Sequence, residues 1–261
     1  MNKTEKDQHK DNRVGKIFIC GAGPGDPKLL TVRAMELINE SDVILYDRLI
    51  GKDIVKLFPE STERVYVGRN IGDPTSHQNK TNELMLHYAK KGKKVLRLKG
   101  GDPFIFGRGG EEAEFLKSNN ISFEIIPGIT SGIGAAIYSG IPLTHRKFSS
   151  AVVFVTGHED PEKKTPEVRW EKLFDAVDTV VIYMGTEKLE TIIEKIRKGT
   201  NNGNKKIAVI ENSTLKNQRV IKGELDNIIK KVKQEGIRPP AIIIIGDTVE
   251  LHDKIAWYPY P

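Results

Sequence analysis

The stretch KIFICGAGPGDPKLLTVRAMELIN, residues 16–39, contains the pattern that decides the fold. It begins with a β-rich run bounded by glycines, which is typical of a buried parallel strand. A Gly-rich turn follows, and Asp26 precedes Pro27 as a cap precedes the first turn of a helix. Residues 27–39 then place apolar side chains on one helical face, namely Leu30, Ala34, Leu37 and Ile38. The unit therefore reads as strand, turn and helix.

Similar β-rich runs recur along the chain. The first group occupies residues 42–47, 64–68 and 93–101, separated by segments long enough for crossover helices, which favours a parallel α/β sheet. A second group occupies residues 150–158, 178–185, 206–212 and 241–247. We therefore expect an α/β protein with a disordered tail over residues 1–14 and two α/β domains over residues 15–119 and 120–257.

Composition narrows the class of protein. The 261 residues carry a formal charge of +6, which favours an anionic partner but is small for a nucleic-acid binder. A single cysteine, Cys20, excludes an internal disulfide framework, and the scattered histidines predict no metal site. No apolar run approaches the roughly 18–20 residues of a membrane span, and the charged start lacks the apolar core of a signal peptide. We expect a cytoplasmic protein that binds neither nucleic acid nor membrane.

The turn GAGPGDP, residues 21–27, follows the first strand, where open α/β sheets bind ligands. A dinucleotide site would need Gly at position 26, and Asp47 could imitate its acidic ribose ligand. Asp26 argues against this reading, because its carboxylate would stand where a pyrophosphate meets free N–H groups. A ligand without phosphate fits better, although a turn that serves only chain geometry stays open.

A second turn, LKGGDPFIFGRGGEE at residues 98–112, repeats the combination of glycines and an acid. Asp102 can hold hydroxyls or an amine, and the apolar run Phe104–Phe106 can cover an uncharged group. The two turns together predict a polar crevice beside Asp26 and Asp102 that disfavours anions and suits a cationic or neutral cofactor with an adenosine and an amino-acid end. The alternative is that Glu111 and Glu112 complement a helix dipole and that the phenylalanines fill core.

Several arginines lie in or beside Gly-containing turns. Arg69, Arg108 and Arg146 can each grip a carboxylate with two hydrogen bonds, or remain solvated on the surface. Arg146 ends the small-residue stretch 127–146, whose composition suits close approach to a ligand or to another helix.

These segments match a known family. The matching blocks are GAGPGDPKLLT (21–31), DVILYDRL (42–49), LKGGDPFIFGRGGEE (98–112), PGITSG (127–132), YSGIPLTHR (138–146), VTGHE (155–159) and YMG (183–185). The chain resembles the tetrapyrrole methylases, and among them the members that methylate uroporphyrinogen III. The likeness runs from about Lys16 to about Trp257. It implies a homodimer of two-domain chains with S-adenosylmethionine in the cleft between the domains, and no metal.

The resemblance also implies roles for individual residues. Asp47 matches the family's proposed proton acceptor. Glu111 matches a residue that helps to orient Arg108. The proton-donor position, lysine in well-known members, is Arg69 here, and since arginine stays protonated we expect Arg69 to hold substrate carboxylate instead. Arg108 and Arg146 complete the catalytic set. The implied cofactor contacts are Pro24, Gly100, Gly101, Asp102, Ile105, Thr130, Ser131, Met184, Ser213 and Ala241.

The implied reaction moves methyl groups to pyrrole carbons of uroporphyrinogen III, giving precorrin-1 and then precorrin-2 on the way to sirohaem or cobalamin. Three alternatives stay open. One is another tetrapyrrole methylase with a different acceptor. The others are a nicotinamide-dependent dehydrogenase, which would use Gly21, Gly23 and Asp47, and a nucleic-acid module, which only the basic balance supports.

Overall fold

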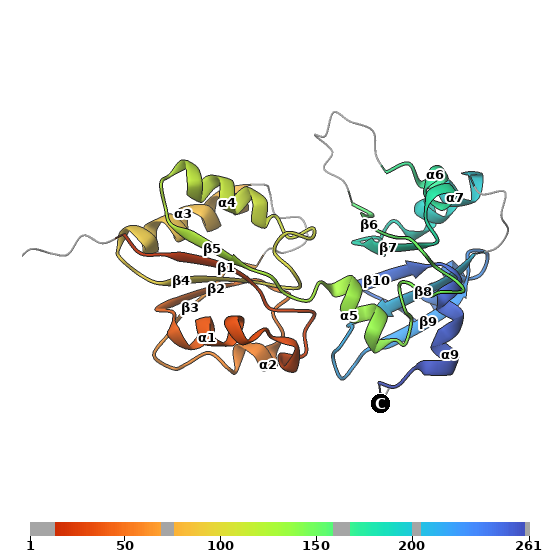
Figure 1. Cartoon of the computed structure of the whole chain (residues 1–261), viewed down its shortest axis with the longest axis horizontal. Coiled ribbons are helices and arrows are strands. Elements are labelled where there is room, and N and C mark those ends of the chain that lie inside the picture. Colours follow the sequence, from red (N-terminus) through yellow and green to blue (C-terminus); the bar gives the residue numbers. More distant parts are fainter. Residues whose placement is uncertain (1–13, 69–75, 159–167, 200–204, 259–261) are drawn as a thin grey trace, which may run out of the picture.

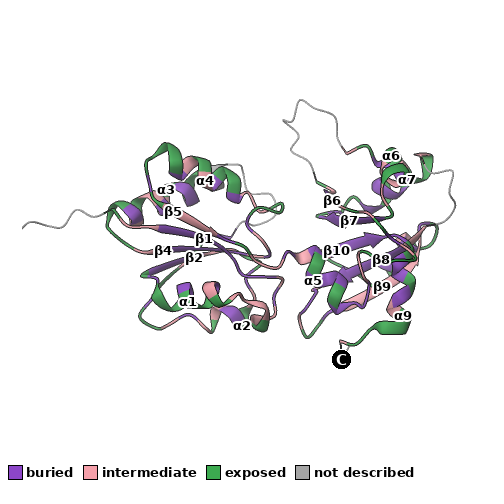
Figure 2. Ribbon diagram, viewed as in Figure 1, coloured by how far each residue is buried: buried purple, intermediate pink, exposed green. Residues whose placement is uncertain are grey.

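The computed structural model describes residues 14–68, 76–158, 168–199 and 205–258, and within them the chain forms two five-stranded sheets. The sheets make up two lobes that lie side by side, each with its own helices (Figure 1). The strands of both lobes are largely buried (Figure 2). The expected α/β fold is confirmed.

The first sheet has the strand order β3-β2-β4-β1-β5, and all its strands are parallel. Because the strands are parallel, their carboxyl ends share one edge, and in Figure 1 this edge faces the second lobe. Helices pack on both faces of the sheet, α1 and α2 on one and α3 and α4 on the other. The bounds are β1 (Ile17–Gly21), α1 (Val32–Glu40), β2 (Val43–Tyr46), α2 (Lys52–Val55), β3 (Glu63–Tyr66), α3 (Ser76–Lys90), β4 (Val95–Lys99), α4 (Gly109–Ser118) and β5 (Phe123–Ile126).

The helix expected over residues 27–39 consists of two parts. A 3₁₀ turn, η1 (Pro27–Leu29), is capped by Asp26, whose side chain accepts from the Lys28 N–H at 2.9 Å. The α1 helix begins only at Val32, because Thr31 is extended and its hydroxyl accepts from the third N–H of the helix as an N-cap. The predicted cap and apolar face are confirmed, with Ala34, Leu37 and Ile38 buried.

The second sheet has the order β6-β7-β10-β8-β9 and is mixed. β6 and β7 are parallel, whereas β10 runs antiparallel to both of its neighbours and β9 antiparallel to β8. Helices α6, α7 and α8 pack on one face and α5 on the other. The bounds are α5 (Ser131–Tyr138), β6 (Val152–Thr156), α6 (Trp170–Ala176), β7 (Thr179–Tyr183), α7 (Leu189–Gly199), β8 (Lys206–Glu211), β9 (Arg219–Glu224), α8 (Ile228–Gln234), β10 (Ala241–Ile245), η2 (Asp247–Leu251) and α9 (His252–Ile255).

Strand β9 is the one strand of this sheet that the sequence analysis missed. It forms an edge of the sheet, and each of its residues is only partly buried. Its sequence RVIKGE mixes charges and a glycine with two apolar residues, so the pattern of a buried strand is absent.

The first sheet extends beyond residue 119, where the sequence analysis ended the first domain. β5 pairs in parallel with β1 and completes that sheet. The pair Asn119-Asn120 ends helix α4 rather than a domain, since Asn119 caps the helix and Asn120 adopts the left-handed conformation with φ 57°. The change of sheet falls between β5 and α5, and the tail expected over residues 1–14 lies outside the described residues except for Val14.

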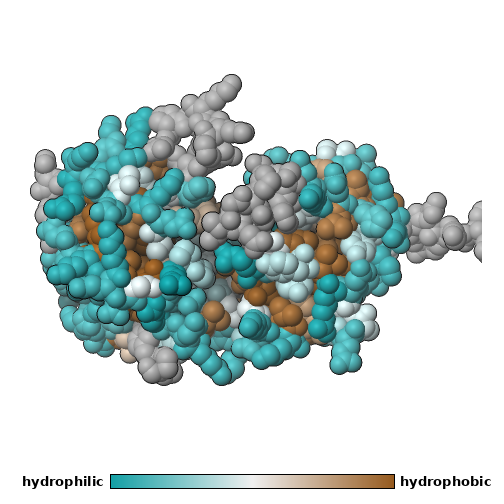
Figure 3. Space-filling view, turned by 180° about the vertical axis from the view of Figure 1, so that it is seen from behind, coloured by the Kyte–Doolittle hydropathy of each residue, from teal (hydrophilic) through white to brown (hydrophobic). Residues whose placement is uncertain are grey.

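Hydrophilic residues cover most of the molecular face drawn in Figure 3, and apolar residues show between them on both lobes. Among the described helices, none has the length and apolar character needed to cross a membrane.

Candidate active site

Three turns that the sequence singled out meet at the carboxyl edge of the first sheet. The Gly101 N–H donates to the Gly23 carbonyl at 2.7 Å, and the Gly23 N–H donates to the Gly101 carbonyl at 3.1 Å. Gly128 lies so close that a Cβ added there would be 2.3 Å from the Gly101 carbonyl oxygen. Only glycines allow these approaches, so the turns form one backbone cluster. Six expected cofactor contacts lie in these turns and at the adjoining start of α5: Pro24, Gly100, Gly101, Asp102, Thr130 and Ser131.

The Asp102 carboxylate stabilises this cluster. One oxygen accepts from the Phe104 N–H at 2.8 Å and the other from the Gly128 N–H at 3.1 Å. Asp102 thus joins the second turn to the segment before α5, and each oxygen keeps a lone pair for a ligand.

Asp26 keeps its expected role as a cap and has a second partner that the sequence analysis did not expect. Its Oδ1 caps η1, and its Oδ2 accepts from the Tyr138 hydroxyl at 3.0 Å. Its backbone N–H donates to the Thr214 hydroxyl at 3.1 Å. Burial and then the bond to Asp26 raise the pKa of Tyr138 to about 12, so this hydroxyl remains a donor. The carboxylate therefore links the two lobes, and Asp102 is the acid of the glycine cluster itself.

Helix α5 is joined to the second sheet by Tyr183, the last residue of β7. The Tyr183 hydroxyl accepts from the Gly132 N–H at 2.8 Å and lies 2.7 Å from the Thr130 hydroxyl. Burial raises the pKa of Tyr183. This contact fixes the N-terminus of α5, where Thr130 and Ser131 lie, against strand β7 of the second sheet.

Three further cofactor candidates lie along one edge of the second sheet. Met184 directly follows β7, and Ser213 follows β8. Ala241 begins β10, and because β10 is antiparallel to both strands, its start lies at the edge where they end. Thr214, beside Ser213, bonds to Asp26, so this edge faces the glycine turns.

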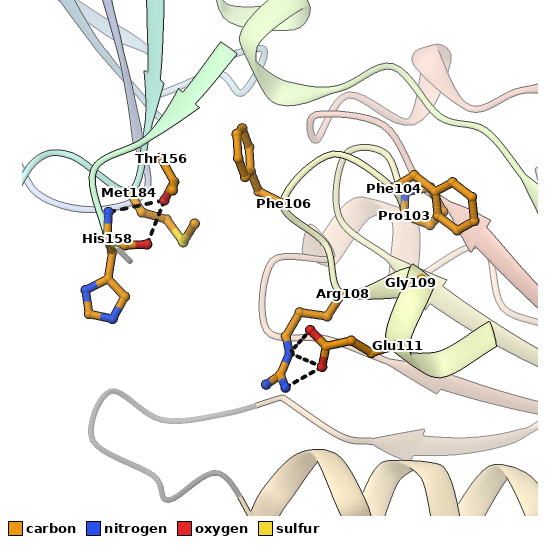
Figure 4. A pocket seen from close by; sticks show the side chains of 10 residues that line it. Pro103, Phe104, Phe106, Arg108, Gly109, Glu111, Thr156, His158 and Met184 are labelled. Atoms are coloured by element: carbon orange, nitrogen blue, oxygen red, sulfur yellow. Dashed lines mark hydrogen bonds and ion pairs between the residues drawn. The ribbon is translucent and has the colours of Figure 1, made fainter. Parts of the chain in front are cut away.

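A cavity of about 480 Å³ lies between the two lobes (Figure 4). Phe106 and Arg108 line it from the first lobe, and Thr156, His158 and Met184 from the second. The volume is in the range of small-molecule sites. The other residues that line it are Pro103, Phe104, Gly109, Gly110 and Glu111. Ile105, although exposed between the two phenylalanines, is not part of this lining.

Unusual backbone conformations gather around this junction. Phe106, Arg108 and Met184, which line the cavity, have φ values of 52°, 59° and 53°, and Asn212 and Thr214 have 48° and 68°. Side chains other than glycine rarely adopt this left-handed region, and such residues concentrate at functional sites.

The arginines expected to hold carboxylates differ in their setting. The Arg108 Nε donates to the two oxygens of Glu111 at 2.9 and 3.1 Å, and Figure 4 shows this pair at the cavity. Arg146 is exposed in the loop after α5 and does not line the cavity. Arg69 lies outside the described residues. Of the three, Arg108 therefore has a geometry that agrees with the expected one.

Asp47 follows β2 at the carboxyl edge, as the sequence analysis expected, and its side chain is 27% exposed. Its Oδ1 accepts from Arg97 Nη2 at 2.8 Å. Arg97 Nε and Lys99 Nζ both donate to Glu112 Oε1 at 3.0 Å. Arg97, Lys99 and Glu112 are all buried.

The sequence analysis missed this buried network and considered Glu112 only as a residue that could complement the helix dipole. A signal was present in VLRLK, residues 95–99, where two cations alternate with leucines in a strand expected to be buried on both faces. Such cations require buried counter-charges. Burial lowers the pKa of Lys99, and the charge of Arg97 lowers it further. For Glu112, burial would raise the pKa, but the two cations outweigh it and lower the pKa.

Residues 16–229 match the family model described as Tetrapyrrole (Corrin/Porphyrin) Methylases. The chain is 46% identical to a uroporphyrinogen-III C-methyltransferase of Bacillus subtilis, with 94% of this chain and 95% of the relative covered. It is 47% identical to an S-adenosyl-L-methionine-dependent uroporphyrinogen III methyltransferase of Methanosarcina barkeri, over 92% of this chain and 94% of the relative.

Solved structures and longer relatives agree with this similarity. A uroporphyrin-III C-methyltransferase of Thermus thermophilus complexed with S-adenosylhomocysteine superposes with a TM-score of 0.76 at 34% identity, covering 91% of this chain and all of that one. A sirohaem synthase of Pseudoalteromonas atlantica is 44% identical over 99% of this chain, which spans only 55% of that relative.

Proposed function

Because the chain belongs to the tetrapyrrole methylase family, we propose that it is an S-adenosylmethionine-dependent C-methyltransferase that converts uroporphyrinogen III to precorrin-2 by way of precorrin-1. The observation that carries this function is the junction of the lobes, where the glycine turns, the cavity and Asp47 come together at one edge of the first sheet.

The residues at this junction fit the cofactor. S-adenosylmethionine supplies an electrophilic methyl group on a positively charged sulfur. Glycine backbone at Gly100 and Gly101 permits close approach, and Asp102 and Thr130 offer oxygen acceptors for hydroxyl or ammonium groups. Across the junction, Met184 contributes apolar surface. The proposed contacts are Pro24, Gly100, Gly101, Asp102, Ile105, Thr130, Ser131, Met184, Ser213 and Ala241.

Substrate binding uses the cationic side of the junction. Uroporphyrinogen III is a polycarboxylate, and the Arg108 guanidinium at the cavity suits one of its carboxylates. Glu111 orients Arg108 through the hydrogen bonds to its Nε. We assign Arg69 and Arg146 to further carboxylates of the macrocycle. Fixing the substrate beside the methyl donor supplies roughly 7–11 kcal/mol of the barrier.

Asp47 accepts the proton that the methylated macrocycle loses. The C–H electron pair returns to the ring system, and the proton bonds to a carboxylate oxygen. A positioned base of this kind contributes about 10²–10⁴-fold to the rate.

The test is an assay with S-adenosylmethionine and uroporphyrinogen III, with mass spectrometry to count the methyl groups added. We expect a doubly methylated product. The Asp47→Asn variant should turn over about 10²–10⁴-fold more slowly while keeping its affinity for S-adenosylhomocysteine in calorimetry. Asp53→Asn, which removes an exposed carboxylate paired with Lys56, is the matched control. A wild-type enzyme that transfers no methyl group would refute the function.

We propose further that the enzyme acts in the cytoplasm as a homodimer and that its product feeds sirohaem or cobalamin synthesis. An apolar groove supports a dimer interface, because Ile133, Ile137, Ile255 and Trp257 are exposed around it. Light scattering should give twice the chain mass for the wild type, and Ile137→Lys should shift the protein toward monomer. A monomeric wild type would exclude the dimer.

A further inference from the structure

Arg97 lies in the interior of the first sheet on the central strand β4. Its strand neighbour two residues before, Val95, packs in the apolar cluster beneath α3 and α4. Because side chains alternate along a strand, Arg97 points to this same face. It is only 3% exposed, so its charge is almost completely removed from water.

The Arg97 guanidinium joins two carboxylates. Its Nε donates to Glu112 Oε1 at 3.0 Å, and its Nη2 donates to Asp47 Oδ1 at 2.8 Å. Glu112 comes from α4 on the face of the sheet, whereas Asp47 stands at the sheet edge. The planar, rigid guanidinium is therefore anchored by Glu112 through one nitrogen and bonds Asp47 through another.

The charges of this network are nearly all buried. The groups that face one another are Asp47 after β2, Arg97 and Lys99 on β4, and Glu112 on α4. Moving each ion from water costs several kcal/mol, and well-packed apolar residues would stabilise a core at least as well. Asp47 is the member of this network that is partly exposed to solvent, at the edge of the sheet. Its position points to a task beyond stability.

We propose that Arg97, anchored by Glu112, is a positioning residue for Asp47. The proposal rests on the proposed function, in which Asp47 accepts the proton from the methylated macrocycle. Arg97 holds Oδ1, and Oδ2 has no hydrogen bond among the described residues, so Oδ2 is the oxygen presented to the proton. Lysine at position 97 would keep the charge but lose the fork that bonds Glu112 and Asp47 at the same time.

The test compares Arg97→Lys, Asp47→Asn and the double variant. Arg97→Lys should lower kcat about 100-fold, because a small misplacement of a reacting group has this effect. Its KM and its affinity for S-adenosylhomocysteine should stay within about 2-fold of wild type. The double variant should be no slower than Asp47→Asn alone, because Arg97 acts through Asp47. A purely structural role would instead make the two losses multiply.

Arg219→Lys is the matched control, since Arg219 pairs with the buried Glu211 in the second sheet and should keep wild-type turnover. Should Arg97→Lys fail to fold, Glu112→Gln replaces it, and its loss of kcat should likewise vanish in the Asp47→Asn background. Wild-type kcat in Arg97→Lys, or multiplying losses in the double variant, would overturn the positioning role. An inactive wild type would overturn the proposed function and this role with it.

Discussion

The two sheets differ in what their central strands bury. In the first sheet, β4 places Arg97 and Lys99 in the interior opposite Glu112. In the second, the central strand β10 has the sequence AIIII, and its last four residues are buried among apolar neighbours. The central strand of a stable sheet needs no charged residue, as β10 shows. The charges of the first sheet are therefore best explained by the edge at which they end, where the proposed proton acceptor Asp47 lies.

The largest difference between the sheets is expected when a buried carboxylate is removed. Glu112→Ala leaves two buried cations without this partner, and we expect a loss of about 3–5 kcal/mol in the free energy of unfolding. In the second sheet, Glu211→Ala should cost about 1–3 kcal/mol, because its partner Arg219 is 43% exposed and water can replace the bond. Urea unfolding of both variants measures this, and equal losses would contradict the comparison.

Substitutions in the glycine cluster measure how much the close backbone packing at the edge of the first sheet contributes to stability. Gly128→Ala places a Cβ against the backbone of Gly101 and Gly21, and should cost about 1–3 kcal/mol or more. It should also weaken binding of S-adenosylhomocysteine, since the proposed cofactor turns must separate. Gly110→Ala meets no atom within 4 Å and should leave thermal unfolding unchanged or slightly improved. If the two variants melt alike, the close approach has no energetic consequence.

Acid should affect the first sheet through Glu112. Its pKa in the folded protein lies below the usual 4.5, so its contribution to stability is complete above pH 4.5 and is lost as the pH falls through the folded-state pKa. Chemical unfolding between pH 3 and 6 should show a weaker pH dependence in Glu112→Gln than in wild type. Glu111→Gln, at the exposed neighbour, should retain the wild-type slope.

The smallest expected effect concerns the contact between β7 and the start of α5 within the second lobe. Tyr183→Phe removes the hydroxyl that accepts from Gly132 and meets Thr130, which should cost about 0.5–1.5 kcal/mol. Affinity for S-adenosylhomocysteine should fall modestly, because Thr130 is a proposed contact. Calorimetry measures this affinity, and Tyr66→Phe, which removes a hydroxyl from a half-exposed ring, is the control variant. Undiminished affinity would separate Tyr183 from cofactor binding.

Much of the fold could be predicted because its signals are local. The runs at residues 42–47 and 241–247 are dense in β-branched and apolar residues, and both contain strands. Prediction was wrong where a local pattern has two meanings. Asn119-Asn120 ends a helix rather than a domain, and RVIKGE in β9 forms an edge strand despite its charges.

The site was predictable only in part. The glycine turns and Asp102 were found from residue type and position after strands, and the structure brings the turns together. The second role of Asp26, as a link to Tyr138, depends on the packing of a helix from beyond the first sheet. No spacing along the chain contains that information.

The sequence by itself determined most of the strands, the glycine-rich turns and the position of Asp47 after β2, because periodicity and steric limits act over a few residues. Only the tertiary structure decided that Arg97 reaches both Glu112 and Asp47, and that the start of β10 lies beside the ends of β7 and β8. These contacts follow from strand order and strand direction. Both are fixed by burial of the whole sheet rather than by any one segment.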